Sequence, residues 1–208
     1  MRRHLAASVL LSLPAGAAAF PDGAPWEAAG QDGCVQCHFD APATENSEAV
    51  TVEGLPPAVA PGETYRLRVR LKDARMAAAG FLLSAWQGGG EAGTFVSDGP
   101  RTETSGAKAR STEAGAAPGT EGVVEWTLEW QAPDAPPAEP VVIELWANAA
   151  NGDQSPFGDA THRRAWQLPV GRGDGAAESE AAPDPEANFG SPRRGPSTVS
   201  PAAARRRE

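Results

Sequence analysis

A strict alternation of apolar and polar residues is the feature that most constrains the fold. In "TYRLRVRL" (64–71) every second side chain is apolar, and the side chains between them are threonine or arginine. "VVEWTLEW" (123–130) repeats the pattern, with one face of valine, tryptophan and leucine and the other bearing glutamate and threonine. Because successive side chains of a strand point to opposite faces of its sheet, this period of two predicts half-buried β-strands.

More continuous apolar runs predict the central strands of the same fold. "GFLLSAW" (80–86) and "VVIELWANA" (141–149) are typical of strands that are buried on both faces. Shorter candidates, separated by turns rich in glycine and proline, are "AVTV" (49–52), "GTFVS" (93–97) and "HRRAWQL" (162–168). We therefore expect an all-β domain, an antiparallel Ig-like β-sandwich of about seven to eight strands, preceded by a loop-rich segment.

The chain divides into four parts by composition. Residues 1–19 join a basic start to a short apolar run with small residues before the expected cleavage site, which predicts a signal peptide of the general secretory type. Residues 20–48 form an N-terminal segment rich in alanine, glycine and proline, and 49–170 form the predicted sandwich domain. Residues 171–208 carry almost nothing apolar and are expected to be disordered. The mature protein is therefore expected to be periplasmic or secreted.

Charge and hydropathy limit the partners. The formal net charge of -9 argues against binding nucleic acid or an anionic lipid surface. After the predicted signal peptide no stretch approaches the roughly 20 apolar residues that a spanning helix needs, so no integral membrane span is expected.

The motif "CVQCH" (34–38) holds both cysteines of the chain and one of its three histidines. Covalent attachment of haem needs two thiols that add across two vinyl groups at one edge of the porphyrin, and Cys34 and Cys37 have the spacing for it. His38 directly follows the second thiol and can offer its imidazole to the iron. In an exported protein this arrangement indicates one covalent haem c, with His38 as the iron ligand.

A redox dithiol or disulfide and a metal site also stay open for the motif. A redox dithiol normally lies between a strand and a helix in a βαβ setting, which the surrounding loop-rich sequence does not provide. A structural disulfide between Cys34 and Cys37 would close a very short loop and constrain little. A zinc site would need a fourth ligand, and none lies close by in the sequence.

Two residues are candidates for the second axial position of such a haem. Met76, between two predicted strands, is the only methionine beyond the predicted signal peptide, and its thioether is a common distal ligand. His162 is the weaker candidate, at the expected start of a strand. Each also has a simpler interpretation, since Met76 can fill a gap in packing and His162 can be an exposed strand-end residue.

Several segments together resemble a known family. "GLPPAVAPGETYRLRVRL" (54–71), "VEWTLEWQAP" (124–133) and "IELWANAANGD" (143–153) follow in the order seen in the bacterial choice-of-anchor V domain, and the resemblance covers about residues 22–170. That family is similar to the Reeler β-sandwich and commonly carries an upstream C-x-x-C-H motif. The resemblance thus implies a Reeler-like sandwich behind the cysteine motif.

The sequence favours an exported monohaem c-type protein that transfers single electrons between periplasmic redox partners. The alternative is a β-sandwich module that binds a ligand or a surface, with haem structural or absent. A third interpretation is an open iron site used for sensing or peroxide chemistry. No nucleophile triad, phosphate loop or zinc-hydrolase motif is present in the sequence, so an enzyme is the less favoured class.

Overall fold

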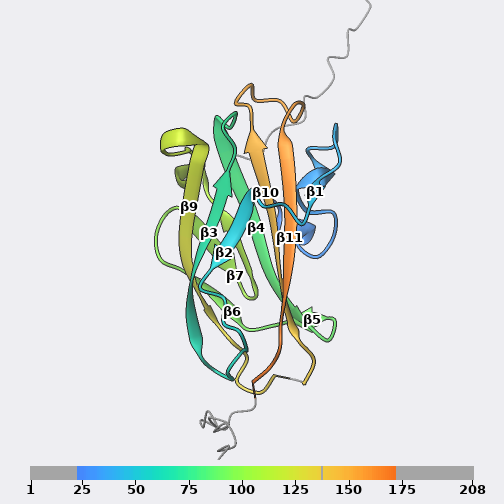
Figure 1. Cartoon of the computed structure of the whole chain (residues 1–208), viewed down its shortest axis with the longest axis vertical. Helices are drawn as coiled ribbons and strands as arrows, with labels where there is room; N and C mark the ends of the chain where they lie inside the picture. The colour runs from blue at the N-terminus through green and yellow to red at the C-terminus, as the bar shows by residue number, and fades with distance from the viewer. Residues whose placement is uncertain (1–22, 137, 172–208) are drawn as a thin grey trace, which may run out of the picture. The chain divides into compact units, whose positions relative to one another are not determined.

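The computed structural model describes residues 23–136 and 138–171, which form two facing β-sheets (Figure 1). The predicted signal peptide and C-terminal tail lie outside the described residues. The seven-stranded sheet has the order β1-β11-β10-β4-β8-β7, with β5 paired to β4, and the four-stranded sheet has the order β2-β3-β9-β6. All strand pairs are antiparallel except β1 with β11. The antiparallel β-sandwich predicted from the sequence is confirmed.

The larger sheet consists of β1 (Thr44–Glu45), β4 (Ala78–Gln87), β5 (Gly90–Glu91), β7 (Thr102–Ser105), β8 (Lys108–Ser111), β10 (Val141–Ala150) and β11 (Ala160–Leu168). The smaller sheet consists of β2 (Val50–Glu53), β3 (Thr64–Lys72), β6 (Thr94–Ser97) and β9 (Val123–Gln131). Four short 3-10 helices complete the described elements: η1 (Trp26–Ala28), η2 (Gly33–Gln36), η3 (Glu113–Gly115) and η4 (Thr120–Gly122). No helix of these residues is long and apolar enough to cross a bilayer.

The alternating segments form β3 and β9, which lie side by side in the smaller sheet. Leu67 pairs with Leu128 in register, and both side chains are fully buried between the sheets. Arg70 and Glu125 pair on the solvated face, where their side chains approach to 3.4 Å. The period of two thus places one face of each strand in the core and the other in water.

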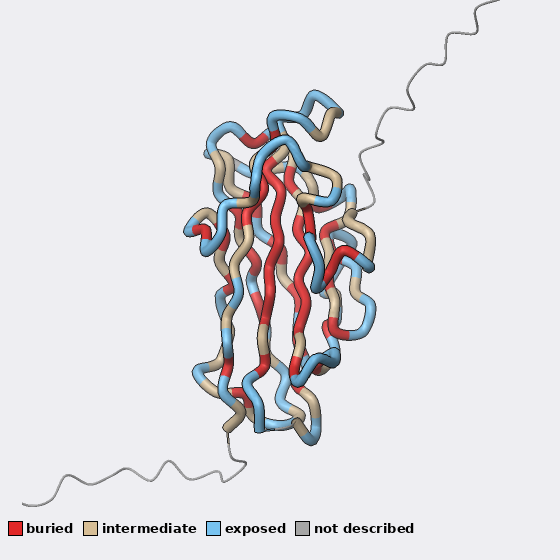
Figure 2. The backbone as a smooth tube through the Cα atoms, turned by 90° about the vertical axis from the view of Figure 1, so that its right-hand side faces the viewer, coloured by how far each residue is buried: buried red, intermediate tan, exposed pale blue. Residues whose placement is uncertain are grey.

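The more continuous apolar segments form β4 and β10, at the centre of the larger sheet, and most of their residues are buried. Figure 2 shows long buried stretches along the middle of the strands. We call the face of this sheet that meets the smaller sheet its inner face and the opposite face its outer face. Leu145 packs in the core between the sheets, whereas Leu82 and Trp146 pack on the outer face against Ala28 and Cys34 of the N-terminal segment. Both faces of the central strands are therefore covered, as their composition predicted.

Strands β7 and β8 were not predicted from the sequence. They come from "TETSGAKARS" (102–111), in which the buried positions are the small residues Thr102, Ala107, Ala109 and Ser111. Small side chains give no apolar period, so this hairpin has strand geometry without the pattern that identifies a strand.

Candidate functional site

The N-terminal segment lies on the outer face of the larger sheet because a glycine permits a close approach. Gly33, the first residue of η2, has a φ of +52°, and a Cβ at this position would clash with the ring of Trp146. At the other end of the segment, the Arg110 guanidinium lies 4.3 Å from the centre of the Trp26 ring and donates a hydrogen bond of 2.8 Å to the carbonyl of Ala24. The segment is therefore attached to the sheet at both ends.

A cavity of about 490 Å³ lies between this segment and the sheet. Its floor follows from the register of β10 and β4: Trp146 pairs with Leu82, but the next outer pair is Asn148 with Gly80, and then Ala150 with Ala78. Side chains shrink along the outer face at this point, which leaves space that the segment covers without filling. The volume lies within the range of about 300–1,000 Å³ that is typical of small-molecule pockets.

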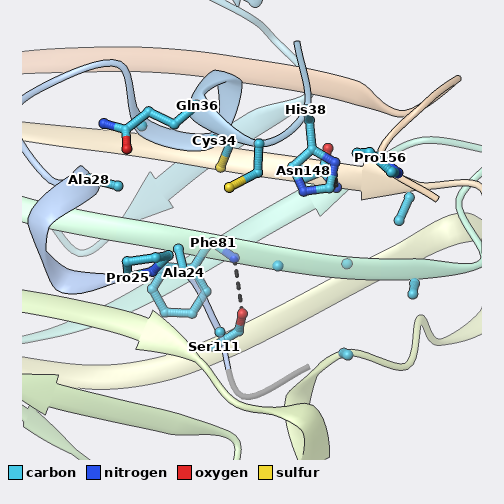
Figure 3. Close-up of a pocket in the computed structure, with 18 of the residues that line it drawn as sticks. Ala24, Pro25, Ala28, Cys34, Gln36, His38, Phe81, Ser111, Asn148 and Pro156 are labelled. Carbon is cyan, nitrogen blue, oxygen red and sulfur yellow. Dashed lines mark hydrogen bonds between the residues drawn. The ribbon is translucent and has the colours of Figure 1, made fainter. Parts of the chain in front are cut away.

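The structure brings the three motif residues Cys34, Cys37 and His38 to the wall of this cavity. In Figure 3 Cys34 and His38 lie on one side of the space, and Phe81 and Ser111 lie across from them. The Ser111 hydroxyl accepts a hydrogen bond of 3.1 Å from the backbone amide of Phe81. The motif and the sheet thus form two walls of one pocket.

His38 is held by a buried carboxylate. Its Nδ1 lies 2.7 Å from Oδ2 of Asp159, whose side chain is 1% exposed, while the His38 side chain is 22% exposed. Since a carboxylate only accepts, Nδ1–H is the donor, and Nε2 is left as the nitrogen that can bind a metal. The Asn148 amide nitrogen is 3.4 Å from Nε2, too long for a strong hydrogen bond.

Asp159 is itself fixed by two further donors. The Asn148 side-chain amide donates to Oδ2 over 3.1 Å, and the backbone amide of Asn151 donates to Oδ1 over 3.0 Å. The adjacent Gly158 amide donates to the Asp40 carboxylate over 2.7 Å, which ties the β10–β11 loop to the chain just after the motif. The His38 imidazole therefore has a defined position relative to the sheet.

The Asn148 side chain also has unused hydrogen-bonding capacity. Its Oδ1 is buried and has no hydrogen-bond partner among the described residues, and Asn148 lines the cavity. A buried acceptor without a partner is costly, so the other contacts of Asn148 must offset this loss.

The two cysteines are free thiols, with Cys34 buried and Cys37 partly exposed. Burial, followed by the neighbouring Cys37 thiol, raises the pKa of Cys34 to about 12. A raised thiol pKa lowers the fraction of thiolate, which is the form that takes part in disulfide exchange. Within residues 23–136 and 138–171 no three His, Cys, Asp or Glu side chains are grouped to hold a metal ion, so the zinc interpretation gains no support.

The structure does not bring Met76 or His162 to this cavity. His162 pairs with Ala147 in register and so shares its inner face, and its Nδ1 lies 2.9 Å from the Ser47 hydroxyl. Burial lowers the pKa of His162, with Asp73 opposing and Arg75 adding to the shift. Met76 is buried in the core cluster between the two sheets. Both candidates for the second axial position therefore lie across the larger sheet from His38.

Sequence reasoning missed Asp159, Asn148 and the small residues of the cavity floor. Asn148 lies in the "VVIELWANA" segment (141–149), which was predicted as a buried strand, and a polar side chain in such a strand was the available signal. The pairing of His38 with Asp159 joins distant parts of the chain and carries no local pattern.

The donor set is the one that covalent haem attachment needs. Two thiols and an imidazole whose Nδ1 contacts a buried carboxylate share the wall of one cavity. If a haem were attached there, Cys34 and Cys37 would hold the porphyrin edge and His38 would offer Nε2 to the iron.

No protein-family model and no curated protein matches the chain. Among solved structures, it is similar to the Reelin-N domain of F-spondin, with 18% identity, 62% of this chain and 93% of that chain covered, and a TM-score of 0.45. It is also similar to the human F-spondin reeler domain, with 18% identity, 62% and 95% coverage and a TM-score of 0.43. A third similar structure is AvmM, which catalyses macrocyclization in alchivemycin A biosynthesis, with 14% identity, 63% and 93% coverage and a TM-score of 0.39. These similarities concern the β-sandwich fold alone.

Proposed function

We propose that this protein is an exported β-sandwich binding module that holds one covalent haem c in the outer-face cavity. Cys34 and Cys37 form the thioether bonds, and Nε2 of His38 binds the iron. The observation that carries the proposal is the 2.7 Å contact between His38 Nδ1 and the buried Asp159 carboxylate, on the wall of the cavity that both thiols line.

This contact supports the proposal because a histidine that ligates a metal almost always donates its other N–H to a carboxylate, carbonyl or water. Such a partner fixes the tautomer and the orientation of the ring. A bound haem supplies one-electron redox chemistry and an iron coordination site. The protein residues supply the covalent anchors, the oriented imidazole and an enclosure lined mainly by apolar and small side chains.

The sequence features extend the proposal to location and partners. On the basis of the predicted signal peptide, we propose that the mature chain is in the periplasm or outside the cell. The resemblance to the bacterial choice-of-anchor V domain, with its C-x-x-C-H motif, supports the same assignment. Single-electron exchange with periplasmic redox proteins is one use of such a haem, and reversible reduction of the purified protein by a physiological donor tests it.

The proposal is tested by expressing the full chain with a periplasmic cytochrome-maturation system. We expect haem staining that survives denaturing electrophoresis in the wild type and in Met76→Leu, a matched control away from the cavity. The double variant C34S/C37S is expected to lose the stain. A folded wild-type protein that carries no covalent haem under these conditions contradicts the proposal.

A second candidate is a module that binds a non-covalent apolar ligand in the same cavity. The small residues of the floor favour it, because they leave space for a ligand. Thermal stabilisation of the haem-free wild type by an apolar aromatic compound, in a chain that never takes covalent haem, would distinguish this candidate.

A further inference from the structure

We propose that His38, positioned by Asp159, is the one axial ligand that this fold supplies, and that the second axial position binds a neutral diatomic molecule such as carbon monoxide or nitric oxide. This inference rests on the proposed haem function. It assigns the site a small-molecule ligand in addition to its cofactor.

The register of β11 determines where the His162 side chain points. His162 pairs with Ala147 on β10 and with Thr44 on β1, and this register directs its side chain to the inner face. To turn His162 outward, β11 would have to slip by one residue, which would turn every side chain of the strand to the opposite face. Its hydrogen-bonding distance of 2.9 Å to Ser47 further fixes the inward position.

Met76 is held in the core between the sheets. Its side chain is 7% exposed and belongs to the core cluster between the sheets. The chain on either side is held by backbone hydrogen bonds, from Met76 to Asp73 over 3.2 Å and from Ala77 to Ala150 over 2.8 Å. A thioether in this position fills the core, which is the simpler of its two sequence interpretations.

The side chains of the cavity wall limit which ligands the cavity can accept. Among the described residues that line it, His38 is the one histidine, and no methionine, lysine or carboxylate is present. The other polar side chains, apart from the two cysteines, are the neutral Gln36, Ser111, Thr112 and Asn148. A small anion fully enclosed by these side chains would find no charged partner to replace its lost hydration, so the enclosure favours a neutral small molecule.

Asp159 affects the basicity of the His38 imidazole. A buried carboxylate that accepts Nδ1–H raises the basicity of the imidazole and so strengthens the bond from Nε2 to iron. The hydrogen bonds from Asn148 and Asn151 hold this carboxylate in place. Asp159 is therefore a positioning residue that acts on the iron through His38.

The test uses the haem-loaded full chain after reduction. We expect a ferrous spectrum typical of five-coordinate high-spin haem and a stoichiometric shift of the Soret band on titration with carbon monoxide. Met76→Leu is expected to leave both unchanged. A six-coordinate low-spin ferrous spectrum that excludes carbon monoxide would overturn the inference, and a gain of carbon monoxide binding in Met76→Leu would identify Met76 as the ligand.

Asp159→Asn tests the positioning role with two further readouts. We expect the iron–histidine stretching band to move to lower frequency and the midpoint potential to rise, while covalent haem and the far-ultraviolet circular dichroism spectrum are retained. If neither the frequency of the iron–histidine band nor the midpoint potential changes, the positioning role of Asp159 is overturned. Absence of covalent haem from the wild type would instead contradict the proposed function, so the two failures are distinguishable.

Discussion

The histidines His38 and His162 lie on opposite faces of the same sheet, and their surroundings give them different chemistry. On β10, Ala147 pairs with His162 on the inner face, and its neighbour Asn148 contacts the His38–Asp159 pair on the outer face. His38 has a buried carboxylate at Nδ1 and a cavity beside it. His162 has a hydroxyl at Nδ1, and its buried Nε2 has no hydrogen-bond partner among the described residues.

This comparison shows that alternate residues of one strand face two different environments. The inner face of the larger sheet is filled by large apolar side chains that pack against the smaller sheet. The outer face carries a short apolar patch, then small residues, and then the polar cluster around Asp159. Substitutions on the two faces are therefore expected to have separable effects on folding and on the proposed haem site.

The largest expected effect comes from the inner face. Leu145 is fully buried, and Leu145→Ala is expected to lower the free energy of unfolding by about 2–5 kcal/mol, because it removes apolar contacts and leaves a cavity. Urea denaturation measures this loss. Val96→Ala, at a residue that is 49% exposed, is the control and is expected to change stability by less than about 0.5 kcal/mol. A similar small change in both variants would show that the inner face is not the main source of stability.

An intermediate effect is expected where the N-terminal segment meets the outer face. Gly33→Ala introduces a side chain at positive φ and against the Trp146 ring, which is expected to destabilise the protein by about 1–3 kcal/mol and to reduce haem loading. Denaturation and the haem-to-protein absorbance ratio are the measurements. Gly99→Ala is the matched control, since a Cβ at Gly99 meets nothing within 4 Å. Full haem loading in Gly33→Ala would show that haem attachment does not require η2 to lie this close to the Trp146 ring.

The smallest expected effect is the pH dependence contributed by His162. Because burial lowers its pKa in the folded state, the unfolded chain binds a proton more readily as pH falls below about 6.5. Stability contributed by neutral His162 is therefore present above that pH and is lost as pH falls toward the lowered pKa. Stability curves from pH 8 to 5, a window of about three units around the ordinary histidine pKa, should be flatter for His162→Gln than for the wild type. Equal pH dependence of stability in the wild type and in His162→Gln would show that folding does not lower the pKa of His162.

The sequence predicted the parts of the structure that have local patterns. Alternation predicted β3 and β9, and the C-x-x-C-H spacing predicted that Cys34, Cys37 and His38 act together. The small-residue hairpin of β7 and β8 has no apolar period, so it was missed. Asp159 could not be found because its contact with His38 depends on how a distant loop meets the N-terminal segment.

The direction of the His162 side chain also could not be predicted. In β11 the buried positions Thr161 and His162 are consecutive, so the strand has no clean alternation from which to assign a face. The face to which the His162 side chain points follows instead from its pairing with Ala147. This pairing depends on the tertiary structure and not on the local sequence. Met76 lies in a connection between strands, where sequence gives no indication of which side chains turn inward.

The most direct measurement compares the two histidines in the same assay. Full-length His38→Ala and His162→Gln are produced with the cytochrome-maturation system, and their haem content by intact mass and their ferrous absorption spectra are compared with the wild type. We predict that His162→Gln gains the mass of one haem and has the wild-type spectrum, whereas His38→Ala loses haem or has a shifted Soret band. A wild-type spectrum in His38→Ala, or a changed spectrum in a folded His162→Gln, would contradict the assignment of the outer face as the haem site.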